Sequence, residues 1–290
     1  MTEILREAGT WLDAGTGKNI SHHTLMAEMA RKRVVLLGET HDRFDIHRWQ
    51  LHVCAGLLAQ RSDIAVGFEM FPRRCQRALD RWVAGELSVA QFLEASEWET
   101  VWRFDPELYL PLFHFCRQFR VPMLALNCER SLVTRVGKEG WDAIPEGQRD
   151  GLTPAVPASL AHRQYLFDIT GGGRSDRPIA GASDPGFDRF VRAQQTWDRA
   201  FACNIAKALK AGVAGQIIGI IGRGHMEYGH GTPFQLAQLG IDDTAILLPS
   251  DEAVVGPDRR TIGDALFRLP GPPDRAAPRK PRPIEKIVNA

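Results

Sequence analysis

Five short runs of apolar residues constrain the fold of this chain more than any other feature of its sequence. Each run has four or five residues, too few for a helix, and is rich in the Val, Ile and Leu that strands buried on both faces contain. The runs are Val34–Leu37, Ile64–Phe68, Pro122–Leu126, Ile217–Ile221 and Ala245–Leu248. Stretches with helical periodicity separate them, at about 46–61, 73–84, 88–96, 106–119, 130–170 and 186–211. This alternation predicts an α/β fold with a mostly parallel central sheet flanked by helices.

The spacing of the runs also predicts how the chain is organised. The longest interval lies between the third and fourth runs, so we expect a helical insertion at about 130–211 within a single α/β domain that spans 1–269. The segment 270–283 holds six prolines in fourteen residues, and basic residues outnumber acidic ones between 270 and 290. Such a composition predicts a flexible, Pro-rich basic tail over 270–290.

The overall charge excludes several classes of protein. The chain has 36 Lys and Arg against 35 Asp and Glu, a formal net charge of +1. A protein that wraps nucleic acid without sequence preference carries a strong basic excess, so we expect no nucleic-acid partner. No run of about 18 apolar residues is present, which predicts no transmembrane segment. The first residues of the sequence show no signal-peptide pattern, so we expect a cytoplasmic protein, or the domain of an exported lipoprotein if the N-terminus is trimmed.

Polar residues follow four of the five runs, at the point where each predicted strand ends. In an open parallel sheet the carboxyl ends of the strands face one crevice, where ligands bind. A sheet that only needed turns would have Gly, Asn, Asp and Ser at these positions, whereas this sequence also has acids and histidines. We therefore expect a functional site at this edge, formed by Glu39, His41, Glu69, Asn127 and His225.

Two G-x-x-H units are the most distinctive part of that edge. They are Gly38–His41 and Gly222–His225, and we expect each glycine to let the backbone turn tightly off its strand. In one interpretation His41 and His225 are metal ligands, with Glu39 or Glu69 as a third ligand or as a general base. In the other, the histidines are acid–base groups without a metal, and the neighbouring acids set their pKa values.

Several motifs in this order resemble the ChaN-like haem-binding proteins of bacteria, within the wider Tiki, TraB and erythromycin-esterase grouping. The motifs are GETHDRFDIHRWQ, FEMFPRRCQRAL, the W-x-x-x-W of Trp98 and Trp102 leading into PELYLPL, LALN, AQQTWDRAFACNIA and GRGHMEYGHGTP. The resemblance implies an α/β fold, a role in iron or haem handling, and haem bound between two subunits with its iron held by a tyrosine. The wider grouping implies metal-dependent proteolysis or ester hydrolysis, whose functional positions fall here on Glu39, His41, Glu69 and His225.

Three tyrosines are the candidates for the iron ligand, because a phenolate can be an axial ligand of haem iron. Tyr228 ranks first since it follows His225 by three residues, Tyr109 ranks second beside an aromatic cluster, and Tyr165 lies in the predicted insertion. Arg130 or Arg223 would pair with the haem propionates. Further candidate contacts of the cofactor are Asn127 and His47, which follows the first G-x-x-H unit.

The sequence therefore supports two functional hypotheses. The first is a homodimeric haem-binding protein of bacterial iron or haem handling, with haem in a crevice or at the dimer interface and a tyrosine as axial ligand. The alternative is an esterase or peptidase that uses Glu39, His41, Glu69 and His225, with or without a divalent metal ion.

Overall fold

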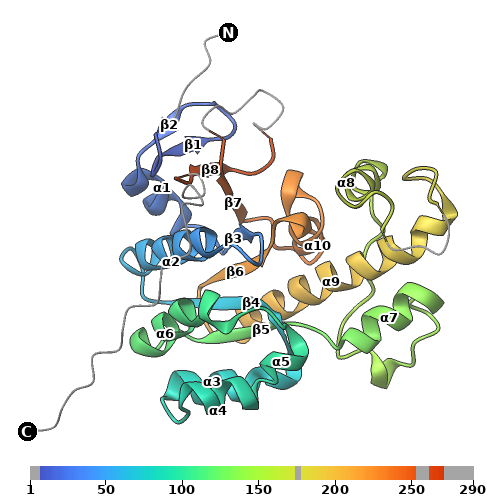
Figure 1. Cartoon of the computed structure of the whole chain (residues 1–290), viewed down its shortest axis with the longest axis horizontal. Helices are drawn as coiled ribbons and strands as arrows, with labels where there is room; N and C mark the ends of the chain where they lie inside the picture. Colours follow the sequence, from blue (N-terminus) through green and yellow to red (C-terminus); the bar gives the residue numbers. More distant parts are fainter. Residues whose placement is uncertain (1–6, 174–177, 253–260, 271–290) are drawn as a thin grey trace, which may run out of the picture.

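One eight-stranded sheet forms the centre of the molecule, in the order β2-β1-β8-β7-β3-β6-β4-β5 (Figure 1). The computed structural model describes residues 7–173, 178–252 and 261–270, so residues 271–290 of the predicted tail lie outside the described part. The strands are β1 (Trp11–Asp13), β2 (Asn19–Ile20), β3 (Val34–Glu39), β4 (Ile64–Pro72), β5 (Met123–Asn127), β6 (Gln216–Gly222), β7 (Thr244–Ser250) and β8 (Ala265–Arg268).

All five predicted strands are present, as β3, β4, β5, β6 and β7. They and β8 pair in parallel, while β1 pairs antiparallel with both β8 and β2. The predicted α/β fold with a mostly parallel sheet is therefore confirmed. The strands that the pattern missed, β1, β2 and β8, are only two to four residues long and lie together at one side of the sheet.

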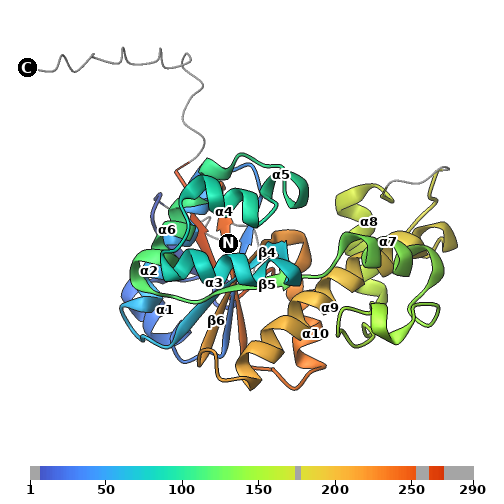
Figure 2. The ribbon, with the colours of Figure 1, turned by 90° about the horizontal axis from the view of Figure 1, so that it is seen from below.

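Helices cover both faces of the sheet (Figure 2). The α-helices are α1 (His22–Met29), α2 (Phe44–Leu58), α3 (Gln76–Ala84), α4 (Val89–Ala95), α5 (Trp98–Val101), α6 (Leu110–Phe119), α7 (Arg130–Glu139), α8 (Leu160–Thr170), α9 (Asp188–Lys210) and α10 (Thr232–Ala237). Alternate residues of β3 point to opposite faces: Leu37 packs in the core beneath α1, α2 and α6, and Leu36 in the core beneath α9 and α10. The result is a three-layer arrangement whose strands are buried on both faces.

The predicted helical insertion lies between β5 and β6 and contains α7, α8 and α9. The helix expected at 130–170 is wrong as a single element, because it is divided into α7 and α8 by an interval that contains Pro145, Pro154 and Pro157. The long helix α9 returns to the sheet, where Phe201 and Ile205 join the core, while α7 and α8 stand to one side of the sheet (Figure 1).

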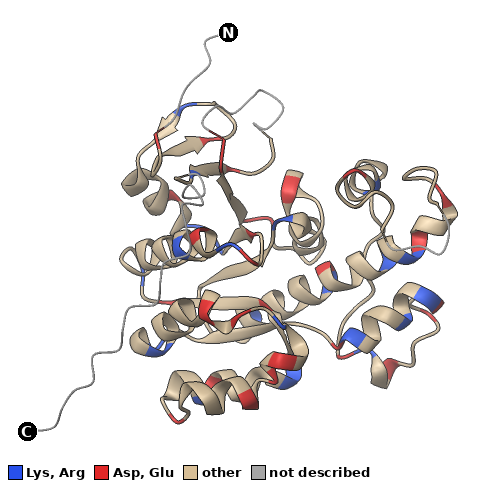
Figure 3. Cartoon of the chain, viewed as in Figure 1, with Lys and Arg blue, Asp and Glu red and all other residues tan. Residues whose placement is uncertain are grey.

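Acidic and basic residues are mixed over the helices of the main body (Figure 3). A capping box starts α4: Gln91 N–H donates to the Ser88 hydroxyl, and Ser88 N–H donates to the Gln91 side chain. Within the described residues, none of the helices has the length and apolar character needed to cross a bilayer.

Candidate functional site

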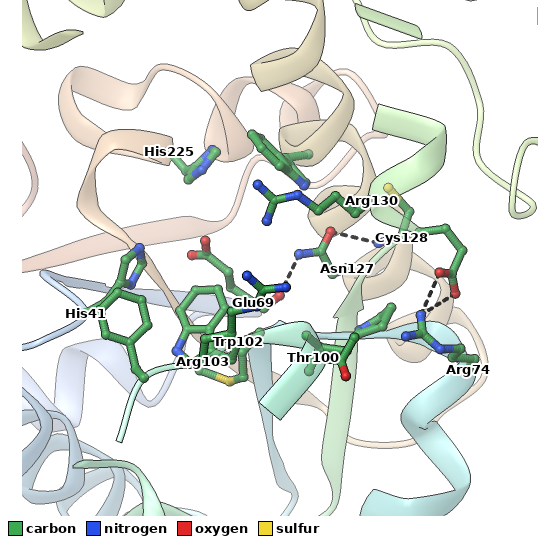
Figure 4. Close-up of a pocket in the computed structure, with 16 residues that line it drawn as sticks. His41, Glu69, Arg74, Thr100, Trp102, Arg103, Asn127, Cys128, Arg130 and His225 are labelled. Atoms are coloured by element: carbon green, nitrogen blue, oxygen red, sulfur yellow. Dashed lines mark hydrogen bonds and ion pairs between the residues drawn. The ribbon is translucent and has the colours of Figure 1, made fainter. Parts of the chain in front are cut away.

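The carboxyl ends of the parallel strands border a cavity of about 490 Å3, which we call the crevice (Figure 4). The residues that line it come from β4 and the turn after it, from α5 and the loop after it, from β5 and the start of α7, from α9, and from the turns after β3 and β6. They are His41, Glu69, Met70, Pro72, Arg74, Thr100, Val101, Trp102, Arg103, Phe104, Asn127, Cys128, Glu129, Arg130, Trp197 and His225. Among the residues expected at this edge, Glu39 is the one that does not line the crevice, because it is buried behind His41.

Glu39 is the centre of a buried hydrogen-bond network behind the crevice. One carboxylate oxygen lies 2.8 Å from Nδ1 of His41 and accepts a hydrogen bond of 2.8 Å from the Tyr109 hydroxyl. The other oxygen accepts from the Gln50 amide at 3.2 Å. Burial alone would raise the pKa of Glu39, but the hydrogen bond from His41 and the charge of His47 lower it. The carboxylate is therefore ionised and holds the His41 ring in one orientation.

His41 presents its other ring nitrogen to the crevice. Its ring meets the Trp102 ring at a centroid distance of 4.7 Å and the Phe104 ring at 5.4 Å. Burial alone would lower the pKa of His41, but the hydrogen bond to Glu39 and the charge of Glu69 raise it above the usual value. His47 does not line the crevice; it is buried, with Nε2 3.1 Å from the His41 carbonyl oxygen, and it supports the backbone of the turn.

His225 is held in the same way by a different carboxylate. Its Nδ1 lies 2.7 Å from a carboxylate oxygen of Asp198, a buried residue in the middle of α9. Burial alone would lower the pKa of His225, but the charges of Asp198 and Glu69 and the Asp198 hydrogen bond raise it to about 9. At neutral pH the imidazole therefore carries a positive charge that faces the crevice.

Glu69 lies on the wall of the crevice with His41 and His225 (Figure 4). Its carboxylate accepts a hydrogen bond from the Gly222 N–H, and its backbone carbonyl accepts one of 2.8 Å from the Asn127 amide. Gly222 at the end of β6 thus orients the Glu69 carboxylate, and Asn127 at the end of β5 orients the Glu69 backbone. The edge brings together two acid–histidine pairs and a third carboxylate, and of these residues the strand-end pattern indicated all but Asp198 of α9.

The first glycine of each G-x-x-H unit is explained by close packing rather than by an unusual backbone conformation. Gly222 has φ −54°, which any residue can adopt, and Gly38 is also outside the positive-φ region. A Cβ at Gly222 would lie 3.0 Å from Cε1 of His41 and 3.3 Å from the Glu69 carboxylate, and a Cβ at Gly38 would lie 2.3 Å from the Leu248 side chain. The expectation that these glycines turn the backbone is therefore wrong: they leave room for the site.

The two histidines are grouped with carboxylates in pairs rather than as one metal-ligand set. No group of three or more His, Cys, Asp or Glu side chains in the described residues has the arrangement that a metal ion would need. In each pair the carboxylate approaches Nδ1, so Nε2 is the nitrogen left for a ligand or for proton transfer.

A second group of side chains lies outside the crevice, and we call it the tyrosine face. It consists of Tyr165 and Ile169 of α8 and of Tyr228 and His230, which follow β6. The Tyr228 ring lies 5.6 Å from the Tyr165 ring and 6.2 Å from the His230 ring. Ile169 is half exposed, and it approaches Gly224 of the same turn. Tyr228 is 40% exposed and has a positive φ of 60°, a conformation that a bulky side chain rarely adopts.

The three tyrosines differ in what their hydroxyls contact. Tyr109 is fully buried and donates to Glu39, so it belongs to the network behind the crevice and is not on the protein surface. Tyr165 donates to Glu227 at 2.7 Å. Burial and the neighbouring carboxylate raise the pKa of both phenols, so both remain protonated donors. Arg223 donates to the same Glu227 from the other side.

Asp198 is the main functional residue that the sequence analysis missed. It lies within a helix of mixed polar residues, where a single acid is usually solvent-exposed. A usable signal is present in the sequence, however, because Phe201, Ala202 and Ile205 follow at the helical spacing of three, four and seven. An acid on the apolar stripe of a helix is buried, and a buried acid needs a partner. Trp197 and Arg103 also line the crevice without having been predicted.

Comparisons with known proteins agree with this architecture. A family model described as haem-binding uptake, Tiki superfamily, ChaN matches residues 25–236. A solved structure of ChaN from Campylobacter jejuni, described as showing cofacial haem binding, has a TM-score of 0.68 at 22% identity and covers 90% of this chain and 97% of that one. The type III effector HopBA1 has a TM-score of 0.50 at 11% identity, with coverage of 85% and 91%. The erythromycin esterase EreC has a TM-score of 0.48 at 10% identity, with coverage of 83% and 76%. A search of curated proteins returned no match.

Proposed function

Since this chain belongs to the ChaN family of haem-binding uptake proteins in the Tiki superfamily, we propose that it binds haem and that the Tyr228 phenolate is the axial ligand of the iron. The observation that carries the proposal is the difference among the three tyrosines. Tyr109 and Tyr165 donate their hydroxyls to carboxylates, whereas the Tyr228 ring is exposed and its hydroxyl has no hydrogen-bond partner within the described residues. An iron ligand has to be reachable by the haem, and its oxygen has to be free of other partners, so Tyr228 fits the role.

The surroundings of Tyr228 suit a porphyrin. A porphyrin is large, flat and mostly apolar, and the rings of Tyr165 and His230 and the exposed side chain of Ile169 offer it apolar surface. Glu227 fixes the guanidinium of Arg223 in the same turn, where it would meet a propionate of the bound haem. When bound, the haem supplies the iron; the chain supplies the ligand and the apolar wall.

We further propose that two copies of the chain close over the haem at their tyrosine faces. In one copy Tyr228 and Ile169 are exposed together, and Leu160 at the start of α8 is 77% exposed. Apolar side chains left open on one side of a ligand surface favour a second surface that covers them. The cofacial haem binding described for the Campylobacter jejuni protein fits such an arrangement. The role we propose is the handling of haem or iron in a bacterium.

Titration of the purified chain with haemin tests the ligand assignment. We expect saturable binding with a tyrosinate-type spectrum, and we expect Tyr228→Phe to abolish that spectrum. Tyr165→Phe and Tyr109→Phe are the matched controls, because each removes one phenol and leaves Tyr228 in place. An unchanged spectrum in Tyr228→Phe contradicts the ligand assignment, and absence of saturable binding contradicts the function. Light scattering with and without haemin tests the dimer.

A second candidate function is hydrolysis of an ester or peptide, and the convergence of two acid–histidine pairs on Glu69 favours it. The His225 imidazolium would stabilise the negative charge that develops on the attacked carbonyl oxygen. Glu69 would accept the proton of the attacking water, and His41 would protonate the leaving group. Haem binding at the tyrosine face does not require these pairs, so both functions can occur in one chain.

An ester and peptide panel tests this second function. We expect His41→Ala and Glu69→Gln to remove turnover, and we expect His52→Ala, an exposed histidine of α2 outside the crevice, to leave it unchanged. Metal analysis of protein purified without chelators tests whether the crevice also holds a divalent ion. A panel without turnover in the unmodified chain contradicts the hydrolase.

A further inference from the structure

Two arginines of the crevice differ from its other basic residues, because neither pairs with an acidic side chain within the described residues. Arg103 and Arg130 line the cavity and are exposed, and neither has an ion pair or a side-chain hydrogen bond within the described residues. Arg74, in contrast, binds Glu97 at 2.9 Å and Glu129 at 2.6 Å. Figure 4 shows the Arg103 and Arg130 side chains reaching toward the space that His41, Glu69 and His225 border.

From this arrangement we propose that the crevice binds a small molecule through an oxyanion, a phosphate or a carboxylate, held between the guanidiniums of Arg103 and Arg130. The guanidinium group presents paired N–H donors in a plane, and this fork matches two oxygens of a phosphate or carboxylate. Two such forks directed at one cavity can hold an oxyanion from two sides.

The backbone at each arginine supports the same assignment. Arg103 has a positive φ of 70°, a strained conformation for a residue with a long side chain. Strain of this kind persists where the surrounding structure imposes it, and here it places the arginine on the crevice wall. Arg130 is the first residue of α7, a ten-residue helix whose N-terminus has no side-chain cap. The free N–H groups of that first turn add positive potential beside Arg130.

The remaining charges of the crevice favour an anion as well. Arg74 pairs with Glu97 and Glu129, and within the part of the chain that the structure describes Glu69 is the carboxylate of the wall that no arginine pairs with. Glu39 and Asp198 lie behind the histidines and raise the pKa values of His41 and His225. Among the residues that line the crevice, the guanidiniums of Arg74, Arg103 and Arg130 outnumber the carboxylates of Glu69 and Glu129. An oxyanion would relieve that excess.

The rest of the wall limits the kind of molecule that carries the oxyanion. Trp102, Phe104 and Trp197 supply apolar surface, and the cavity of about 490 Å3 is in the range of small-molecule sites. A ligand with one aromatic or apolar group next to its phosphate or carboxylate would use both parts of the wall. The structure therefore favours an aryl phosphate or an aromatic carboxylate over a purely inorganic ion.

This inference is independent of haem binding at the tyrosine face. Tyr228 is not among the residues that line the crevice, so a chain that failed to bind haemin could still bind the oxyanion. The inference also changes the role of Arg130, which the sequence analysis connected with a haem propionate. In the structure Arg130 faces the crevice together with Arg103, and Arg223 remains the arginine nearest in sequence to Tyr228.

Isothermal titration calorimetry of the full chain tests the proposal, with inorganic phosphate, phenyl phosphate and benzoate as separate probes. We expect saturable binding of at least one probe, and the tighter of the last two identifies phosphate or carboxylate as the source of the oxyanion. Arg103→Gln and Arg130→Gln should each weaken that binding by about tenfold, because each removes a charge-assisted pair of hydrogen bonds. Arg77→Gln is the matched control, an exposed arginine of α3 outside the crevice, and should change nothing.

Two results would overturn the proposal. One is the absence of saturable binding of all three probes to the unmodified chain. The other is binding that Arg103→Gln and Arg130→Gln weaken no more than Arg77→Gln does. Both crevice arginines are exposed, so the variants should fold, and an unchanged thermal unfolding midpoint for each variant verifies this.

Discussion

The crevice and the tyrosine face share one turn of the chain, yet their side chains are held in different ways. Behind the crevice wall, Glu39 and Asp198 are buried and fix the rings of His41 and His225. At the tyrosine face, Tyr228 is exposed and its hydroxyl has no partner within the described residues. Buried pairs set the geometry of a site before any ligand arrives, whereas an exposed ring is fixed by what binds to it. The comparison indicates that one chain fixes the geometry of the crevice, whereas the tyrosine face is the surface at which we propose that haem binds.

The largest expected effect tests whether the crevice is preorganised. Glu39→Ala leaves the donors of Tyr109, Gln50 and His41 without their acceptor, so we expect the free energy of unfolding to fall by about 3 kcal/mol. Thr40→Ala, an exposed change in the same motif, is the control for urea denaturation. If Thr40→Ala lowers the free energy of unfolding as much as Glu39→Ala does, the buried network of Glu39 is not what distinguishes the crevice from the tyrosine face. Haemin binding by folded Glu39→Ala should persist.

A second test uses the pH dependence of stability. The pKa of His225 is raised from 6.5 to about 9, so its contribution is complete below pH 6.5 and is lost as the pH rises through about 9. Charged or titratable groups that act on His225 are Asp198 of α9 and Glu69 of β4, with His41 and His162 also in range. We expect the free energy of unfolding to fall by about 3 kcal/mol across this window.

Asp198→Asn separates this histidine from other titrating groups. The variant removes the charge that raises the pKa of His225, so we expect a flatter pH profile in denaturation experiments and a lower His225 pKa by NMR titration. If the variant and the unmodified chain show the same slope, the buried pair is not the source of the pH dependence, and the preorganised character of the crevice is in doubt.

The third test concerns the space between the strand ends. A Cβ at Gly222 would lie 3.0 Å from the His41 ring, so Gly222→Ala should displace that ring and lower the free energy of unfolding by about 1.5 kcal/mol. Gly224→Ala is the control, since its Cβ would make an ordinary contact of 3.5 Å with Ile169. Thermal unfolding of the two variants measures the difference, and similar midpoints would show that the crevice can adjust.

The smallest expected effect tests the tyrosine face. Both Tyr228→Ala and Tyr228→Gly remove the phenol, but only glycine adopts the φ of 60° without strain. We expect the glycine variant to be more stable than the alanine variant by about 1 kcal/mol in chemical denaturation. Equal stabilities would mean that the turn relaxes when the side chain is removed, and that Tyr228 is less firmly positioned than its φ indicates.

The sequence predicted the parts of this molecule that depend on local pattern. Strands β3 to β7 were predicted because a strand buried on both faces is apolar along its whole length. His41, Glu69, Asn127 and His225 were placed at one edge because all parallel strands end on the same side. Both arguments use neighbouring residues and a topological rule, and neither needs the tertiary structure.

The parts that were missed depend on contacts between distant segments. Asp198 is paired with His225 only because α9 folds back across the sheet, and Arg103 reaches the crevice only because the loop after α5 adopts a strained conformation. The division of 130–170 into α7 and α8 was different, since its prolines were visible and their effect on a helix is known. The short strands β1 and β8 carry too few residues for any periodicity to be read.

The pairing of β3 with β6 has a consequence for how such chains are recognised. The two strands are adjacent and in register, with Gly38 opposite Ile221 and Glu39 opposite Gly222, so the two G-x-x-H units form a single pattern in space. The sequence between them could lengthen, shorten or diverge without changing the separation of the two histidines, as long as the ladder is kept. A search that treats the two units as one interrupted signature, joined by a strand pair and indifferent to the distance along the chain, would find distant relatives that either unit alone would miss.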